Sequence, residues 1–173
     1  MLTEEIFSQL VAHMKKGILI HNQMTSLFGF LNLKKYQKRQ EKQFYEENKN
    51  CRELQDYYLN RYQKLLPELP VENPVLIPQN WIKYTKSEVD TNTKRSTVKD
   101  LFKKWIEWET QTKEIFQNAY KVLLENGDID ATYKIGELIQ DVENELQFAR
   151  ETKINLDAMD YDIVAIIDRQ EKF

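Results

Sequence analysis

The stretch "PELPVENPVLIPQNWIKYTKSEVDTNTK", residues 67–94, decides how the rest of the chain can be arranged. It holds all four prolines of the sequence, so no other segment contains a proline that would end a helix. An irregular connection of this length is uncommon in a compact domain unless its length has a purpose. Extended at roughly 3.3 Å per residue, it can run the full height of a helical bundle about 45 Å tall. The stretch therefore predicts a long crossover between two halves of the chain.

Glycine and asparagine divide the remaining sequence into long pieces with a helical period. Gly29 and Asn32 separate the first piece from the second, and Gly127 in "ENGDID" separates the third from the fourth. Apolar residues recur at steps of three and four in each piece, and alternation of period two is not sustained anywhere. The expected elements are helices over about 3–29, 33–66, 95–125 and 129–156, a crossover over about 67–94 and a short tail helix over about 159–171.

The lengths of the connections predict the arrangement of these helices. Short turns make the first and second helices antiparallel neighbours, and they do the same for the third and fourth. We expect the tail to dock on the bundle or on another subunit through its apolar residues, and the crossover to be held by apolar side chains, namely Val75, Leu76, Ile77, Trp81 and Tyr84. The predicted fold is one all-α domain over 1–173, a four-helix bundle of two up-down pairs joined by one long crossover.

The composition argues against several classes of protein. Lys and Arg total 25 against 28 Asp and Glu, a net charge of −3 that lacks the basic excess of a dedicated nucleic-acid binder. Cys51 is the single cysteine, so neither an internal disulfide nor a thiolate metal cluster can form within one chain. The start, "MLTEEIFSQL", has acids where a signal peptide has basic residues, and no segment reaches the roughly 20 apolar residues of a membrane span. We expect a soluble, cytoplasmic protein.

Four segments together resemble a known family. They are "MLTEEIFSQLVAHM" (1–14), "ETQTKEIFQNAYKVLLENGDIDAT" (109–132), "ELIQDVENELQFARE" (137–151) and "YDIVAIIDRQ" (161–170). The sequence is similar to the ferritin-like superfamily, and most similar to the non-haem bacterial ferritins. The likeness extends over most of the chain, but no single motif in it is specific, so it supports a fold more strongly than an activity.

The resemblance implies a di-iron site inside the bundle, built from a Glu on each of two helices and Glu-x-x-His motifs or a close variant on the others. Glu109 stands where ferritins place the ligand of the third helix. In the fourth helix either Asp141 or Glu145 matches the acidic ligand, and Glu145 lies better on the inward stripe. Gly17 stands in place of the ligand of the first helix. Glu-x-x-His is absent from the second helix, where Glu47 and Cys51 are the nearest equivalents. We therefore expect no ordinary ferroxidase centre.

A relocated metal site remains an alternative. His21 lies one helical turn from Gly17 on the same face, so its imidazole would enter the space left by the missing carboxylate, and Glu47, Glu109 and Glu145 would complete a mixed site for iron or another metal. The other interpretation is that Glu47 and Glu145 border the core and reach water, with His21 a histidine at the core edge.

The stretch "KKWIEWETQTK", residues 103–113, leaves the direction of Glu109 open. One helical stripe places Glu109 inward, and a second stripe through Trp105 and Trp108 places it at the shoulder. Cys51 is expected to be a small buried apolar residue. The basic run "LKKYQKRQEKQ", residues 33–43, is expected to be a solvated face, with a patch for an anionic partner as the alternative.

Two functions follow as hypotheses. The first is a ferritin-like protein that binds iron or another metal at a degenerate site without catalysis. The second is a metal-free helical bundle that serves as an interaction or structural module. In either case we expect a homo-oligomer formed through the bundle or its C-terminal tail.

Overall fold

The computed structural model describes residues 2–172, with side chains through residue 170, and this part of the chain is helical without any strand. The four long helices are α1 (Thr3–Phe30), α2 (Lys34–Tyr62), α3 (Thr91–Glu125) and α4 (Ile129–Ala158). A short 3₁₀ helix, η1 (Gln79–Lys83), interrupts the linker, and α5 (Ile163–Lys172) follows α4. The prediction of an all-α protein is confirmed.

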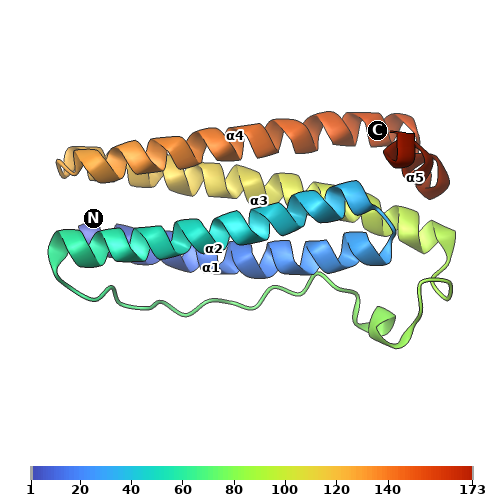
Figure 1. Ribbon diagram of the computed structural model, residues 1–173, viewed down its shortest axis with the longest axis horizontal. Coiled ribbons are helices and arrows are strands. Elements are labelled where there is room, and N and C mark those ends of the chain that lie inside the picture. Colours follow the sequence, from blue (N-terminus) through green and yellow to red (C-terminus); the bar gives the residue numbers. More distant parts are fainter. Residues whose placement is uncertain (1, 173) are drawn as a thin grey trace.

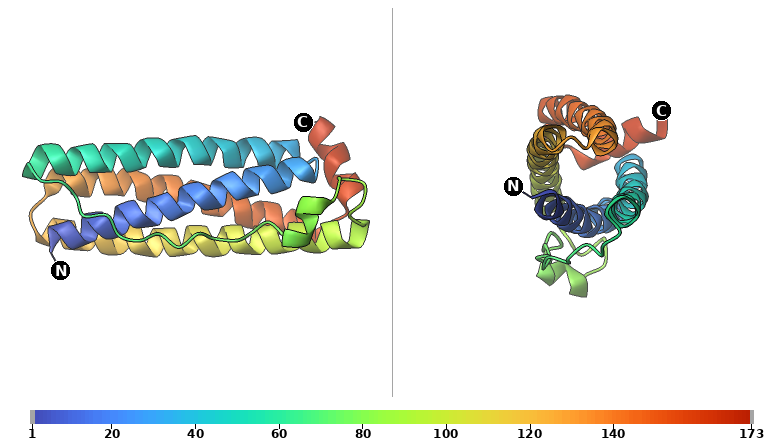
Figure 2. Two further views of the ribbon diagram at one scale, coloured as in Figure 1. Left: turned by 90° about the horizontal axis from the view of Figure 1, so that it is seen from below. Right: turned by 90° about the vertical axis from the view of Figure 1, so that its left-hand side faces the viewer.

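The four long helices lie alongside one another, and the linker between α2 and α3 runs along them from one end to the other (Figures 1 and 2). Helices α1 and α2 are antiparallel and packed together, as are α3 and α4, and α1 also packs against α3. The two turns use left-handed backbone at the expected places, Asn32 with φ 60° and Gly127 with φ 78°.

The helix bounds differ from the expected ones where side chains or backbone geometry set the ends. Helix α2 ends at Tyr62 rather than near 66 because Gln63 adopts left-handed backbone, φ 55°. Helix α3 begins at Thr91 rather than near 95 because the Asp90 carboxylate accepts hydrogen bonds from the Thr93 amide (2.8 Å) and hydroxyl (2.6 Å). The segment without long helices is therefore 63–90.

The linker lies on α1 and is held there by polar contacts at several points. The Gln23 side chain donates to the carbonyl of Pro74 and accepts from the amide of Leu76 at 2.8 Å. Among the apolar residues expected to hold the linker, Trp81 is buried and stacks on Phe30, and Leu76 and Ile77 are partly buried. Val75 and Tyr84 are exposed, so the prediction was wrong for these two residues.

The apolar core forms two clusters. One lies toward α5 and includes Phe28, Phe102 and Trp105; the other lies toward the opposite end and includes Phe7 and Phe116. Buried polar side chains lie in the stretch between the two, namely His13, His21, Gln40, Glu109, Thr112 and Glu145. Burying so many polar groups costs free energy unless each finds a partner. This polar layer is therefore the part of the interior where a functional site is most expected.

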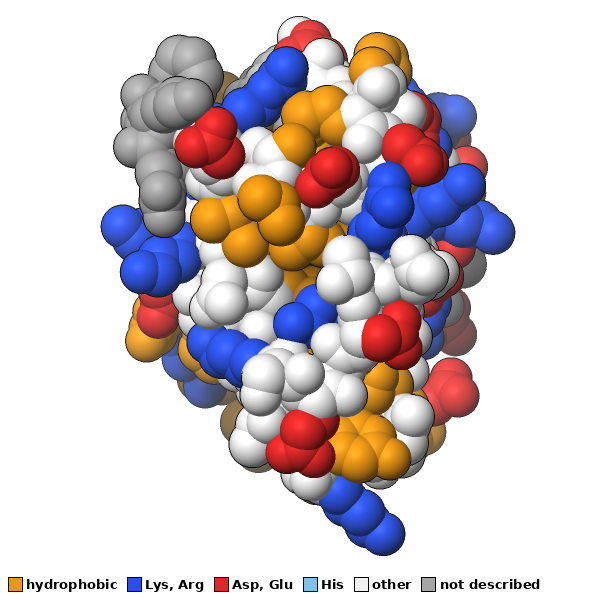
Figure 3. All heavy atoms as spheres, turned by 90° about the vertical axis from the view of Figure 1, so that its right-hand side faces the viewer, with side chains coloured by type: hydrophobic (Ala, Val, Ile, Leu, Met, Phe, Trp, Pro, Cys, Tyr) orange, Lys and Arg blue, Asp and Glu red, His pale blue; other side chains and the backbone are white. Residues whose placement is uncertain are grey.

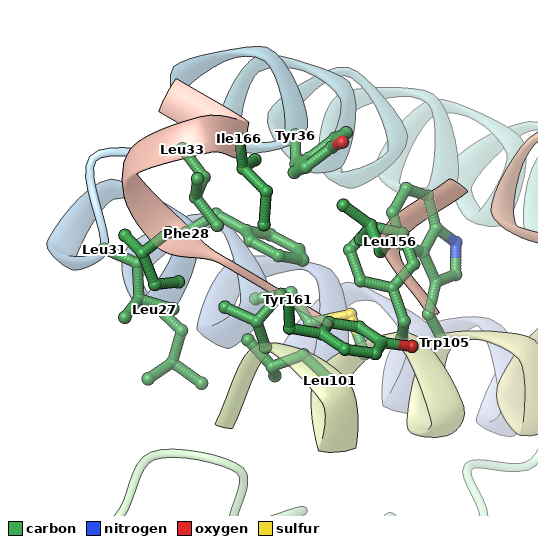
Figure 4. Close-up of a cluster of buried hydrophobic side chains, with 14 of the residues drawn as sticks. Leu27, Phe28, Leu31, Leu33, Tyr36, Leu101, Trp105, Leu156, Tyr161 and Ile166 are labelled. Carbon is green, nitrogen blue, oxygen red and sulfur yellow. The ribbon is translucent and has the colours of Figure 1, made fainter. Parts of the chain in front are cut away.

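Helix α5 docks on its own chain. Ile166 points into the cluster formed by Leu33, Tyr36 and Leu156 and is 1% exposed (Figure 4). Val164 is one of the apolar tail residues through which docking was expected, but it is 73% exposed, so the prediction was wrong for this residue. The end of the molecule that carries α5 shows apolar side chains scattered among charges of both signs (Figure 3).

Candidate functional site

A small interior pocket of about 30 Å³ lies in the polar layer, where all four long helices contribute to its lining. Four of the five predicted site residues line it: His21 from α1, Glu47 from α2, Glu109 from α3 and Asp141 from α4. A space of this size holds one or two water molecules or a single ion. The structure thus gathers most of the predicted site around one point.

Glu109 is the most buried carboxylate of this group. It is 3% exposed, so it lies inward rather than at the shoulder of α3. Its Oε1 atom has no hydrogen-bond partner among the described residues. Burial raises the pKa of Glu109 well above its ordinary value, and the neighbouring carboxylates of Glu47 and Glu145 raise it further. This carboxyl group therefore holds a proton or requires a cation.

Glu47 faces the same space from α2. It is partly buried and packs against Gly17, where an added Cβ would lie 3.6 Å from the Glu47 carboxyl carbon. Loss of water raises the pKa of Glu47 to about 8, with a further contribution from the negative charge of Glu46. Two carboxyl groups with raised pKa values thus share a pocket in which no described side chain supplies a positive charge to either.

A tryptophan fills the space beside Gly17, where the resemblance places a ligand on the first helix. A Cβ at Gly17 would lie 3.1 Å from Cζ2 of Trp108, which is closer than ordinary packing allows. The Trp108 indole stacks on the His13 imidazole with centroids 4.2 Å apart, and His13 Nε2 lies 2.7 Å from the Thr112 hydroxyl. A carboxylate side chain at position 17 would therefore have to displace the indole from these contacts.

His21 is buried, 2% exposed, rather than at the core edge. Its Nδ1 donates to the Gln40 side-chain oxygen at 2.7 Å. Burial lowers the pKa of His21 to about 4, although the Gln40 hydrogen bond opposes that shift. The ring is therefore neutral at pH 7, with Nδ1 carrying the proton and Nε2 a lone pair. Metal-binding histidines are commonly held in this way, by a hydrogen bond on the other ring nitrogen.

Glu145 is turned inward and is bound by an arginine that sequence reasoning missed. Arg39 donates from Nε to Oε2 at 3.1 Å and from Nη2 to Oε1 at 2.8 Å, while Glu145 is 8% exposed. Burial raises the pKa of Glu145, and Arg39 partly offsets that rise. Asp141, the alternative residue on α4, is exposed at the edge of the pocket. The stripe thus chose correctly between these two acids.

Neither Gln40 nor Arg39 was singled out from the sequence, and only Gln40 could have been predicted from the pattern. Extending the buried stripe of α2 backwards from Leu54 and Cys51 in steps of three or four reaches Glu47 and then Gln40, so Gln40 had a signal. Arg39 had none, since it lies in a basic run whose charged residues are expected to face solvent. Its inward contact depends on where α4 lies.

The residues fit a conventional di-iron centre poorly and a smaller site better. The first-helix carboxylate is replaced by Gly17 with Trp108 beside it, and Glu145 is bound by Arg39. Within residues 2–172 no three His, Cys, Asp or Glu side chains are already arranged to hold a metal ion. The Glu47 and Glu109 pair, with water as the remaining ligands, is a donor set that hard divalent cations accept.

No protein-family model and no curated protein sequence matches this chain. Among the described helices, none has both the length and the apolar character needed to cross a bilayer.

Proposed function

We propose that this protein is a ferritin-like four-helix bundle that binds a single divalent cation, iron included, between Glu47 and Glu109 and does not perform di-iron oxidation. The topology supports the first part: two antiparallel helix pairs with a linker that runs the length of the molecule between them. The second part rests on the residues of the polar layer.

The observation that carries the cation site is the unpartnered Oε1 of Glu109. Buried carboxylates almost always have hydrogen bonds or a positive partner, because an unpaired charge in the interior is expensive. Here a 3% exposed carboxylate faces a second acid across a small pocket, without a cationic side chain. A bound divalent ion would neutralise both acids and occupy the vacant coordination directions. Neutral His21, on the pocket wall, would offer an additional nitrogen donor.

Anaerobic titration with ferrous iron tests this proposal. Protein freed of metal by a chelator is loaded with Fe²⁺, desalted and analysed for metal content. We expect one equivalent in the wild type and its loss in Glu109→Gln, which keeps the size of the side chain but removes the charge. Glu107→Gln is the matched control, because Glu107 lies on the same helix, is exposed and pairs with Lys103. No bound metal at any loading would refute the cation site.

A metal-free structural module is the second candidate, and a specific observation favours it. Both carboxyl groups have pKa values raised above the ordinary range, so protons alone can neutralise them at pH 7. In that case the polar layer needs no ion, and the protein acts through its surface. The same titration separates the two candidates, since the module binds no metal in either the wild type or the Glu109→Gln variant.

We also propose that the protein is cytoplasmic and forms homo-oligomers. The lone cysteine, Cys51, is buried and free, which suits a reducing compartment. Large apolar side chains are exposed around the turn between α3 and α4, namely Leu124, Ile129 and Tyr133, and these are candidates for a contact between copies. Sedimentation velocity over a range of protein concentrations would detect the assembly, and a monomer at every concentration would exclude it.

A further inference from the structure

The contact between Arg39 and Glu145 joins α2 to α4 inside the polar layer. Both carboxylate oxygens are engaged, at 3.1 Å by Nε and at 2.8 Å by Nη2. Such a two-point contact fixes the geometry of the pair and places a positive charge on both carboxylate oxygens. Most other ion pairs of α2 are different in kind, for they lie on the surface at i,i+4 spacing, such as Arg52 with Asp56.

The surroundings hold the guanidinium in this position. Its central carbon lies 3.6 Å from the centre of the Phe148 ring, so one face of the cation rests on an aromatic surface. Phe148 follows Glu145 on the same side of α4 and also contacts Trp105. The guanidinium of Arg39 is therefore held by the Glu145 carboxylate and the Phe148 ring. The Arg39 side chain is 33% exposed, so about two-thirds of it is buried.

Glu145 also lies near enough to Glu109 for the two negative charges to interact. Glu109 thus has two acidic neighbours: Glu47, which has no cationic partner among the described residues, and Glu145, which has Arg39. Without the guanidinium, Glu145 would be a second buried acid that has no cationic partner among the described residues, as Glu109 is. A guanidinium bound to both oxygens of a carboxylate competes with a metal ion for it, because both are cations and the guanidinium already supplies a full positive charge at that acid.

We propose that Arg39 is an internal cation that takes the place of a metal ion at Glu145, so that the protein binds one ion where an unblocked cluster would bind two. This inference rests on the proposed cation site at Glu47 and Glu109. It explains why one of the three acids has a permanent partner within the chain while the other two do not. Arg39 is a residue that determines stoichiometry rather than a ligand.

Removing the guanidinium should open the second position. The experiment measures Mn²⁺ bound to the chelator-treated full chain by equilibrium dialysis, together with the electron paramagnetic resonance spectrum. Arg39→Met keeps an unbranched apolar stem against Phe148 and removes the charge, and Arg52→Met is the control for loss of an exposed arginine on the same helix. We expect one ion in the wild type and in Arg52→Met, and two in Arg39→Met, with the six-line spectrum of an isolated ion replaced by that of a coupled pair.

The outcomes separate this inference from the function on which it rests. If the wild type binds none and Arg39→Met binds one, the Glu47 and Glu109 site is refuted while the role of Arg39 stands. An Arg39→Met variant that is folded by circular dichroism and binds no more ions than the wild type overturns the role of Arg39.

A second variant keeps the test decisive if Arg39→Met does not fold. Glu145→Gln leaves Arg39 in the protein and removes the acid that it blocks. The inference requires the ion bound by the wild type to remain, with its affinity changed by less than about threefold. Loss of the ion, or a tenfold weaker affinity, would show that Glu145 is already a metal ligand in the wild type and would overturn the proposal.

Discussion

Glu109 and Glu47 have carboxyl groups whose protonation is coupled to folding. In the unfolded chain both titrate near the ordinary value for glutamate, whereas in the folded chain burial raises both pKa values, that of Glu47 to about 8. A raised pKa means that the folded state binds the proton more tightly than the unfolded state does. The stabilisation from that proton is complete at low pH and is lost as the pH rises.

Metal-free protein should therefore lose stability as the pH rises from about 4.5 toward 8, the interval between the unfolded and folded values of Glu47. Each proton contributes a slope of at most about 1.4 kcal/mol per pH unit to the free energy of unfolding. Urea denaturation in the presence of a chelator measures this profile. The double variant Glu47→Gln with Glu109→Gln should flatten it, and Glu107→Gln should not. Parallel profiles for wild type and double variant would contradict the prediction.

Gly17 and Gly136 offer a matched pair of helical glycines. An added Cβ at Gly17 would meet Trp108 at 3.1 Å, while at Gly136 it would meet Tyr120 at an ordinary 3.6 Å. Alanine gains about 1 kcal/mol over glycine in a helix, but overpacking costs about 1–3 kcal/mol. Gly136→Ala should thus stabilise the protein by up to about 1 kcal/mol and Gly17→Ala should destabilise it by about 1 kcal/mol. Thermal denaturation of both variants measures the difference. Equal stabilisation would show that the Trp108 indole moves to make room for the added methyl group.

At the scale of elements, Asp128 connects the end of α2 to the start of α4. Its carboxylate caps α4 by accepting from the Ala131 amide at 3.1 Å and also accepts from the hydroxyls of Tyr57 and Tyr62. Burial acts to raise the pKa of Asp128, but these donors together hold it below its ordinary value. The two helix pairs are therefore joined at this end by a buried hydrogen-bonded group rather than by the chain.

Asp128→Ala should lower the free energy of unfolding by about 2–3 kcal/mol, because it removes a helix cap and leaves two tyrosine hydroxyls without their acceptor. Asp130→Ala is the control, since Asp130 lies in the same first turn but is exposed. That change should stay within about 0.5 kcal/mol of the wild type. Urea denaturation measures both, and similar losses would mean that the tyrosine contacts contribute nothing.

The linker depends on α1 in a comparable way. Gln23 satisfies the carbonyl of Pro74 and the amide of Leu76 with one side chain. Gln23→Ala should release this part of the linker, and limited proteolysis within residues 67–78 should become at least about fivefold faster, since two hydrogen bonds are lost and about 1 kcal/mol alone corresponds to that factor. The control variant Asn22→Ala, changed at the adjacent exposed position, should be cleaved at the wild-type rate. If the two variants are cleaved equally fast, the hydrogen bonds of Gln23 are not what holds the linker on α1.

For the whole molecule, the polar layer between two apolar clusters determines what chemistry the interior can support. Oxidation of iron by the ferritin mechanism needs a pair of ions held by carboxylates and a histidine on several helices. Here Trp108 fills the space beside Gly17, and Arg39 binds Glu145. The interior is thus better suited to one ion or none than to a reacting pair.

We therefore expect that adding Fe²⁺ in air to the wild-type protein will not accelerate the formation of ferric iron over buffer alone. An oxygen electrode together with the absorbance of ferric species measures the rate. The same preparation with Glu109→Gln serves as the internal control. Oxidation clearly faster than in buffer, and lost in Glu109→Gln, would restore the active-ferroxidase interpretation.

The periodicity and the clustered prolines were enough to place the four long helices, their turns and the linker. These features are local: a step of three or four marks a buried stripe, and proline, Gly127 and Asn32 act on their own backbone. The same stripe placed Glu145 rather than Asp141 inward, as the burial of Glu145 confirms. The helix bounds were less well predicted, because caps such as Asp90 depend on side-chain geometry.

The sequence by itself thus determined an all-helical chain and favoured Glu145 over Asp141 as the inward acid of the fourth helix, while it left the direction of Glu109 open. Only the tertiary structure decided how those acids are neutralised: Arg39 reaches Glu145 from another helix, Trp108 fills the space beside Gly17, and Glu109 is left without a partner among the described residues. The reason is physical. Helical period is a property of neighbours along the chain, whereas the partner of a buried charge is set by which helices pack together.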